Sequence, residues 1–391
     1  MARSVEGRPA LGEASGARQK ASGNGRRPAA RPPIRRLAAL GVVALRLRLA
    51  ALPALTLALG VACVLAAAVG AAPIPPLTTT AVLLNSTHLV HIAPTWPATD
   101  EAILLQLRFP RVVGAVLVGA ALSTSGALFQ GLLRNPLADP LLLGTSSGAA
   151  LGATLGFVVP AFFATEWLGF SLVAVLAFAG ALLAVALVYG LATRRGQTPV
   201  VTLLLAGVAV STVLTAAQTL LLARSSGLGT HIFGLYSWLS GGIGVQGWGQ
   251  VVVTVPLVVL ALAVAQLLAP ALDAFALGEE MAAHLGLSVE RVKLAIVGVA
   301  ALLVGAAVSL SGLVGFVGLV APHVCRITLG PRHRLLLPAA ALAGAIFVVL
   351  ADLLARTLAA PTELPLGVIT ALVGAPFFLT VLRRAGRGYS W

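Results

Sequence analysis

Residues 167–191 read WLGFSLVAVLAFAGALLAVALVYGL and contain no charged side chain. A transmembrane helix needs about 20 consecutive apolar residues to cross a bilayer, and this run is long enough. The rest of the chain is similar, because 59% of the 391 residues are hydrophobic and only 10% are charged. A soluble domain could not bury so much apolar surface. The sequence therefore predicts an all-α polytopic membrane protein.

Further apolar runs on both sides of this segment raise the prediction to about ten transmembrane helices. Their limits lie near 49–72, 111–132, 141–163, 167–191, 199–223, 249–269, 293–312, 313–326, 335–359 and 365–382. The 42 glycines suit such a bundle, because small residues let helices approach closely in lipid. We expect one transmembrane domain over residues 49–387.

Positive charge is concentrated in residues 1–48, which hold 11 of the 26 Lys and Arg residues. This stretch is rich in Gly, Pro, Ala and Arg and has no apolar periodicity, which predicts a disordered basic tail. No aromatic residue interrupts it for stacking on bases, so we expect it to lie near anionic lipid and not on nucleic acid. With this tail inside, 22 of the 26 basic residues are cytoplasmic, and both termini are predicted inside.

Two nine-residue stretches resemble each other: residues 118–126 read VGAALSTSG and residues 304–312 read VGAAVSLSG. They lie in the second and seventh predicted helices, which cross the membrane in opposite directions. This arrangement is typical of inverted-topology repeats in transporters. Chance recurrence of small residues in apolar helices is the alternative.

Enzymatic chemistry finds little support. Neither lysine, Lys20 or Lys293, belongs to a phosphate-binding G-x-x-x-x-G-K-[ST] loop, so the chain cannot hydrolyse ATP in that way. The six histidines are scattered, and Cys63 and Cys325 lie in apolar stretches, which predicts no metal site and no disulfide framework. We expect a transport protein without a cofactor of its own.

Three polar features interrupt the apolar pattern. Asp352 and Arg356 share a helix face, either as a simple ion pair or with Arg356 reaching an acidic partner outside. Residues 135–140 read NPLADP, which is either a tight loop or broken backbone beside a cavity. The polar stretch 272–293 carries apolar residues at helical spacing, which predicts a short amphipathic cytoplasmic helix. This helix is either a connection or a docking site for a soluble partner.

These features together resemble the FecCD family of ABC-importer permeases over roughly residues 50–387. The matching stretches are Arg108–Arg111, Gly119–Leu122, Ser125–Gln130, Asn135–Pro140, Gly144–Ala149, Leu277–Glu279, Leu285–Gly286, Gly312–Leu319, Pro322–His323, Arg326, Asp352, Arg356 and Glu363–Gly367. The family implies a ten-helix permease protomer in the bacterial cytoplasmic membrane that pairs with a second protomer. It also implies two cytoplasmic ABC ATPase subunits, which bind the ATP and Mg²⁺, and a periplasmic or lipid-anchored substrate-binding protein.

The resemblance also assigns roles to particular residues. The family's outer arginines, which dock the binding protein, match Arg108, Arg111 and Arg356. Its coupling helix, which contacts the ATPase, matches residues 278–286, and here the implied contacts are Leu277, Gly278, Glu279, Ala282, Leu285 and Gly286. Its cytoplasmic gate, beside the entry to the fifth span at 198–202, matches Asn135, Pro136 and Leu137.

Some positions depart from the family pattern. Phe109 stands where Leu is usual, and Pro331 and Arg332 precede His333 where the family favours Asp. Val200 and Val201 replace the small hydroxyl residues of the cobalamin permease. We therefore expect an importer of an iron chelate, either a ferric siderophore or haem, with cobalamin as the alternative. Two alternatives of another class are a self-contained secondary transporter, which needs ion ligands at mid-membrane, and an intramembrane enzyme.

Overall fold

The computed structural model describes residues 34–385, with gaps at residues 71, 88–89, 160–165, 168 and 226–230. The chain divides into two units, residues 1–46 and residues 47–391. In the first unit, residues 34–46 are helical, as their Ala, Leu and Arg content and their lack of proline favour. Residues 1–33 of the predicted tail lie outside the described residues.

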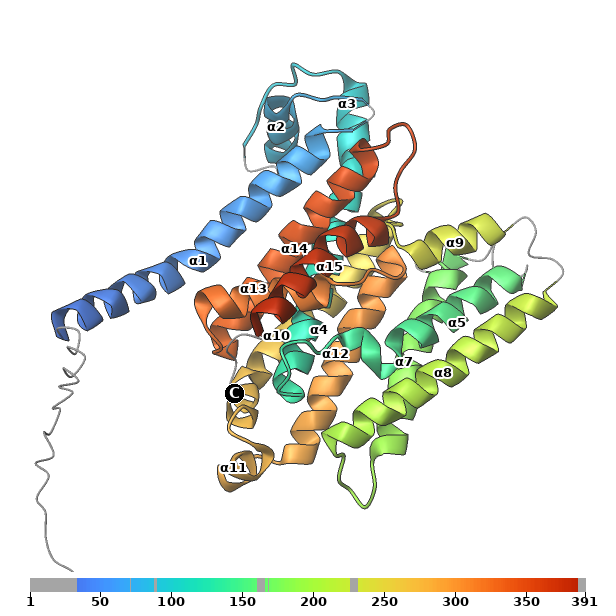
Figure 1. Cartoon of the computed structure of the whole chain (residues 1–391). Helices are drawn as coiled ribbons and strands as arrows, with labels where there is room; N and C mark the ends of the chain where they lie inside the picture. Colours follow the sequence, from blue (N-terminus) through green and yellow to red (C-terminus); the bar gives the residue numbers. More distant parts are fainter. Residues whose placement is uncertain are drawn as a thin grey trace, which may run out of the picture. The chain divides into compact units, whose positions relative to one another are not determined.

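Helix α1 begins in the first unit and ends in the second, and the second unit is built almost entirely from helices (Figure 1). In chain order the elements are α1 (Ile34–Ala68), α2 (Pro76–Ser86), α3 (Ala98–Ala102), a π-helical turn η1 (Ile103–Arg108), α4 (Phe109–Leu132), a 3₁₀ turn η2 (Pro140–Leu143), α5 (Thr145–Val158), strands β1 (Glu166–Trp167) and β2 (Phe170–Ser171), α7 (Leu172–Ala192), α8 (Val200–Arg224), α9 (Ile232–Ser240), α10 (Trp248–Phe275), α11 (Glu279–His284), α12 (Val289–Ser311), α13 (Val317–Leu329), α14 (His333–Thr357) and α15 (Leu366–Ala385).

Seven helical stretches in the described part of the chain are long and apolar enough to cross a membrane. They correspond to seven of the ten predicted spans. The remaining three predictions, at 141–163, 313–326 and 365–382, coincide with the shorter helices α5, α13 and α15. The all-α polytopic fold expected from hydropathy is therefore confirmed.

Helix α4 forms the centre of the bundle and packs against α10, α12, α13 and α14. In the most apolar 18-residue stretch of the span Ala98–Leu132, which includes α4, 89% of the residues are buried. Glycine permits this packing, since a Cβ on Gly119 would overlap the carbonyl oxygen of Gly344, and a Cβ on Gly344 would overlap that of Gly119. Close approach at small residues is the usual way in which helices associate in lipid.

The first turns of two spans differ from the prediction. The second span begins at Ala98 and passes through the π-turn η1 before Pro110, a wider turn that accommodates a residue without an N–H. The fourth begins at Leu172 and not at residue 167, because β1 and β2 pair antiparallel around Gly169, which has a φ of 80°. Ser171 then caps α7 by accepting a hydrogen bond from the Ala174 amide.

An extended segment crosses the end of α12. The amides of Gly242 and Gly244 donate to the carbonyls of Ser311 (2.9 Å) and Leu310 (2.8 Å), and the Leu366 amide donates to the Gly241 carbonyl (2.9 Å). Burial alternates along this segment, because Ile243 and Val245 are buried whereas Gly242 and Gly244 are exposed. The segment thus joins the ends of α9, α12 and α15.

The two similar nine-residue stretches lie on α4 and at the end of α12, two helices that pack against each other. Ser125 in the first stretch donates its hydroxyl to the Ala300 carbonyl of α12 at 3.1 Å. Both helices are largely buried, since 89% and 72% of the residues in their most apolar 18-residue stretches are buried. The inverted repeat itself stays a prediction.

Candidate functional site

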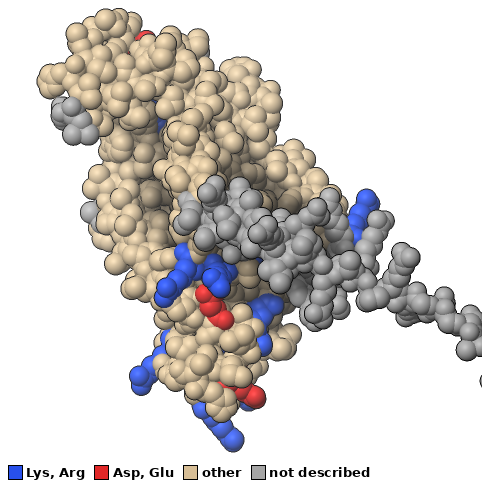
Figure 2. Space-filling model, turned by 90° about the vertical axis from the view of Figure 1, so that its left-hand side faces the viewer, with Lys and Arg blue, Asp and Glu red and all other residues tan. Residues whose placement is uncertain are grey.

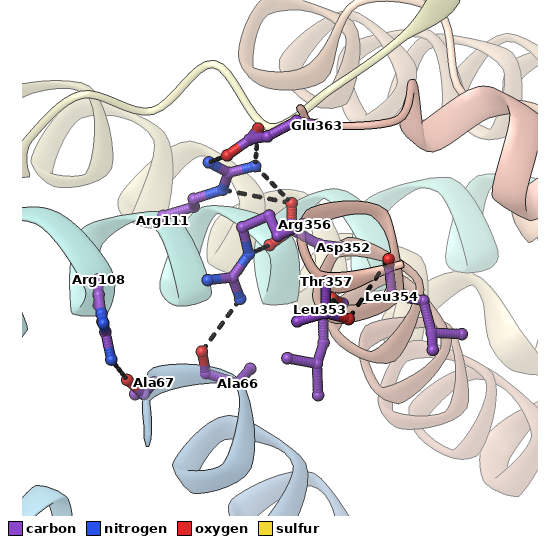
Figure 3. A network of polar contacts seen from close by, with 10 residues as sticks. All are labelled: Ala66, Ala67, Arg108, Arg111, Asp352, Leu353, Leu354, Arg356, Thr357 and Glu363. Atoms are coloured by element: carbon purple, nitrogen blue, oxygen red, sulfur yellow. Dashed lines mark hydrogen bonds and ion pairs between the residues drawn. The ribbon is translucent and has the colours of Figure 1, made fainter. Parts of the chain in front are cut away.

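Arg111, Asp352 and Glu363 form one ion-pair network at an end of the bundle (Figure 3). Arg111 donates Nη1 to Glu363 Oε1 at 3.0 Å and Nη2 to Glu363 Oε2 at 2.8 Å. The same Nη2 lies 3.0 Å from Asp352 Oδ1. The Asp352 carboxylate, only 2% exposed, also accepts from Arg356 Nε at 3.0 Å. The ion pair predicted between Asp352 and Arg356 is present, and Arg111 joins it.

Arg108 and Arg356 bind the C-terminal end of α1. Arg356 donates Nη2 to the Ala66 carbonyl at 3.0 Å, and Arg108 donates Nη1 to the carbonyls of Ala67 at 2.7 Å and Ala68 at 3.0 Å. These carbonyls lack partners within the helix, and the arginines satisfy them and complement the helix dipole. Arg108 is consequently buried, with 9% of its surface exposed.

The three predicted docking arginines line one cavity of about 670 Å³ at this end, together with Glu363 and residues of the loop before it. The structure thus brings Arg108, Arg111 and Arg356 together, but each is already paired within the chain. Glu363 is the accessible member, since 55% of its side chain is exposed. The hydrogen bonds from Arg111 hold the pKa of the Glu363 carboxyl below its usual range.

The predicted amphipathic segment is the short helix α11. Gly278 and Gly286 flank it at φ values of 111° and 86°, backbone conformations that favour glycine. Leu277 and Leu285 expose 69% and 63% of their surfaces, and Met281 between them is also exposed. On the face shown in Figure 2, charged side chains gather toward the end of the molecule that carries α11. An apolar ridge therefore stands exposed in charged surroundings.

Lys293 lies behind this ridge and is 4% exposed. Its Nζ donates to Glu279 Oε2 at 2.7 Å, to Glu290 Oε1 at 3.1 Å and to the Thr198 carbonyl at 3.0 Å. The predicted contact residue Glu279 is thus engaged within the chain, while Ala282 is fully buried. The sequence pattern placed Lys293 among the basic residues of the predicted cytoplasmic side and did not predict this network.

A groove of about 1150 Å³ runs along α8. Its polar lining consists of Ser146, Ser147, Ser211, Thr212, Thr215, Gln218 and Thr219. Several hydroxyls donate to backbone carbonyls of their own helix, as Thr212 does to Val208 at 2.9 Å. None of the described residues that line the groove carries a charge, so its wall offers methyl groups and weak acceptors. No pattern in the sequence predicted this groove.

The predicted gate residues lie in the loop after α4. Asn135 Oδ1 accepts the Leu137 amide at 3.0 Å and closes a tight turn. Pro136 and Leu137 line a narrow crevice with Phe316 and His323 of the α13 region and with Phe377 of α15. The gate assignment stays a prediction. Among the described residues, no three His, Cys, Asp or Glu side chains are grouped to hold a metal ion.

Comparisons with known proteins agree on one group. The model of the FecCD transport family matches residues 56–384. The chain is 45% identical to the cobalamin import system permease protein BtuC of Halobacterium salinarum, over 73% of this chain and 75% of that protein. It is 43% identical to the hemin transport system permease protein HmuU of Yersinia pestis, over 73% and 86%.

A solved structure adds a match in three dimensions. A metal-chelate type ABC transporter in an inward-facing conformation aligns with a TM-score of 0.72 and 28% identity. The alignment covers 85% of this chain and 98% of that one.

Proposed function

Because the chain belongs to the FecCD transport family, we propose that it is the permease subunit of an ABC importer that carries an iron chelate, a ferric siderophore or haem, into the cell. Family membership removes the secondary-transporter and enzyme alternatives. The bacterial cytoplasmic membrane is the expected location, with both termini inside.

The groove along α8 is the observation that supports a large chelate as the substrate. Its volume of about 1150 Å³ exceeds the roughly 300–1000 Å³ of common ligand pockets. An uncharged wall of methyl groups and hydroxyls, several of which already donate to backbone carbonyls, binds no part of a chelate strongly, so the substrate can move along it. Since the groove is open on one side, a second protomer facing α8 would complete the path.

Partner subunits supply what this chain lacks. Two ABC ATPases bind ATP and Mg²⁺ and hydrolyse the ATP, while this chain holds no cofactor. The exposed ridge of Leu277, Met281 and Leu285 is the surface we assign to the ATPase, because an exposed amphipathic helix suits an apolar groove on a partner. Gly278 and Gly286 set the direction of this helix. In the loop after α4, Asn135, Pro136 and Leu137 form the cytoplasmic gate.

A periplasmic or lipid-anchored binding protein docks at the cavity lined by Arg108, Arg111 and Arg356. Guanidinium groups suit bidentate contacts with carboxylates. As these arginines are paired within the chain, docking proceeds by exchange, in which an incoming carboxylate takes the place of Glu363 on Arg111. Arg108 and Arg356 hold the end of α1 and fix the shape of the docking surface.

Cobalamin is the second candidate substrate. Two relatives support the two candidates almost equally, the cobalamin permease at 45% identity and the hemin permease at 43%. Uptake into vesicles that contain this chain, its ATPase and its binding protein, tested with haem, ferric siderophores and cobalamin, separates them. ATP-dependent uptake of an iron chelate supports the proposal, and uptake of cobalamin alone contradicts it.

ATPase docking has its own test. Changing both Leu277 and Leu285 to serine should abolish co-purification of the ATPase, whereas the matched change of the exposed Ala283 and His284 to serine should leave it intact. Equal co-purification with both double variants would reject the assignment of this ridge.

A further inference from the structure

We propose that Lys293 is a positioning residue that connects α11 to the start of α8, so that a displacement of α11 moves α8. The inference rests on the proposed function, in which α11 receives the ATPase and α8 lines the substrate path. It adds the physical connection between these two elements.

Lys293 makes three hydrogen bonds to three different segments. An ammonium group has three donors, and here one goes to Glu279 on α11, one to Glu290 on α12 and one to the backbone carbonyl of Thr198. The amine is buried, so water does not compete strongly for these bonds. Lys293 is therefore the common partner of α11, α12 and the turn before α8.

The Thr198 turn is held firmly on its other side. The Thr198 amide donates to Glu290 Oε2 at 3.0 Å, and the Thr198 hydroxyl lies 2.9 Å from that of Thr193. Backbone bonds between Arg194 and Gln197, at 2.9 and 3.1 Å, close the turn. Because α8 begins at Val200, two residues later, a shift of Thr198 reaches this helix directly.

Burial of the charge explains why the connection transmits motion. Moving Glu279 away would remove one of the two carboxylates that neutralise the buried Lys293 ammonium, and the loss of a partner is unfavourable for a buried charge. The favourable response is for Lys293 and the Thr198 turn to follow α11. Two carboxylates and a carbonyl around one cation thus make the three segments move together.

Transport coupling tests the connection. Glu279→Ala removes the link on α11, and Glu280→Ala makes the same charge change at an exposed neighbour on that helix. With the partner ATPase and binding protein present, the substrate carried per ATP hydrolysed should fall about fivefold or more for Glu279→Ala and stay at the wild-type value for Glu280→Ala. Equal ratios for the two variants would overturn the proposal.

A distance measurement on the full chain alone makes the test independent of transport. Cys63 and Cys325 are first changed to alanine. Spin labels at Ala283 and Gln197, both exposed, then report the separation between α11 and the Thr198 turn. The distance distribution should broaden in Glu279→Ala and stay narrow in Glu280→Ala, and equal widths contradict the connection. If the importer carries no substrate of the panel, the proposed function fails while these distances still decide the role of Lys293.

Discussion

Arg111 and Glu363 are joined by two parallel hydrogen bonds of 3.0 and 2.8 Å, which saturate one edge of the guanidinium with a carboxylate of the same chain. A carboxylate from a docking protein would need that same edge. Under the proposed docking, Glu363 would therefore compete with an acidic partner, and its exposed position would let it leave without opening the bundle.

Removing this competitor should strengthen docking. In Glu363→Gln the neutral amide holds Arg111 less tightly, so we expect the affinity for the binding protein to rise. Because exposed ion pairs contribute about 0.2–1 kcal/mol, the gain should not exceed roughly fivefold. Surface plasmon resonance on the permease in nanodiscs measures it, with Glu101→Gln as the control outside the cavity. A loss of affinity would show that Glu363 itself contacts the partner.

Acid should weaken the same pair. The pKa of Glu363 is lower in the folded chain than in the unfolded one, so the pair stabilises the fold above the unfolded value of about 4.3. This stabilisation is lost as the pH falls through the folded-state pKa. Thermal unfolding between about pH 5 and pH 3 should therefore show a smaller acid-induced drop in Glu363→Gln than in the wild type. Parallel curves would contradict the assignment.

Asp352 should matter far more to stability than Glu363. Asp352→Asn leaves Arg111 and Arg356 without their shared, buried anion, which costs about 3 kcal/mol or more. The thermal midpoint in detergent should fall clearly, while the exposed control Glu280→Gln should stay within about 0.5 kcal/mol of the wild type. Similar midpoints for the two variants would show that solvent screens Asp352.

Contact between α4 and α14 depends on the absence of a single methyl group. Gly119→Ala places a Cβ against the Gly344 carbonyl, and such overpacking costs about 1–3 kcal/mol. Gly298→Ala on α12 is the matched control, because nothing lies within 4 Å of its Cβ position; it should be neutral or stabilising by up to about 1 kcal/mol. Unfolding in detergent compares them, and equal stability would rule out the close approach.

Filling the groove along α8 should stop transport without disturbing assembly. Thr212→Phe places a ring in the groove, whereas Val213→Phe changes an exposed neighbour outside it. If the ring adds about 1–3 kcal/mol to the barrier for passage of the substrate, uptake falls about fivefold or more. Both variants should retain the ATPase on purification. Equal uptake by the two would exclude the groove as the path.

Hydropathy predicted the bundle well, because crossing a membrane demands long apolar runs wherever they occur. Short elements such as α2 and α9 were missed, since they are not long enough to span and carry no comparable pattern. The short helix α11 was predicted from the spacing of Leu277, Met281, Ala282 and Leu285, although Leu277 and Leu285 lie just outside its two ends.

Pairing between distant residues could not be predicted. The Arg111–Asp352 contact joins α4 to α14, and only their packing at Gly119 and Gly344 brings the two side chains together. Lys293 is the last residue of the charged stretch 272–293 in the sequence, so its burial emerges only when α11, α12 and the Thr198 turn assemble around it.

The extended segment at 241–244 has a consequence for the order of synthesis. Its amides at Gly242 and Gly244 emerge from the ribosome well before Leu310 and Ser311, whose carbonyls they need, and Gly241 waits longer still for Leu366. Until those later helices have inserted, this backbone has no partner in the chain and must remain where water can reach it. These three hydrogen bonds can therefore form only after α12 and the start of α15 have been synthesised.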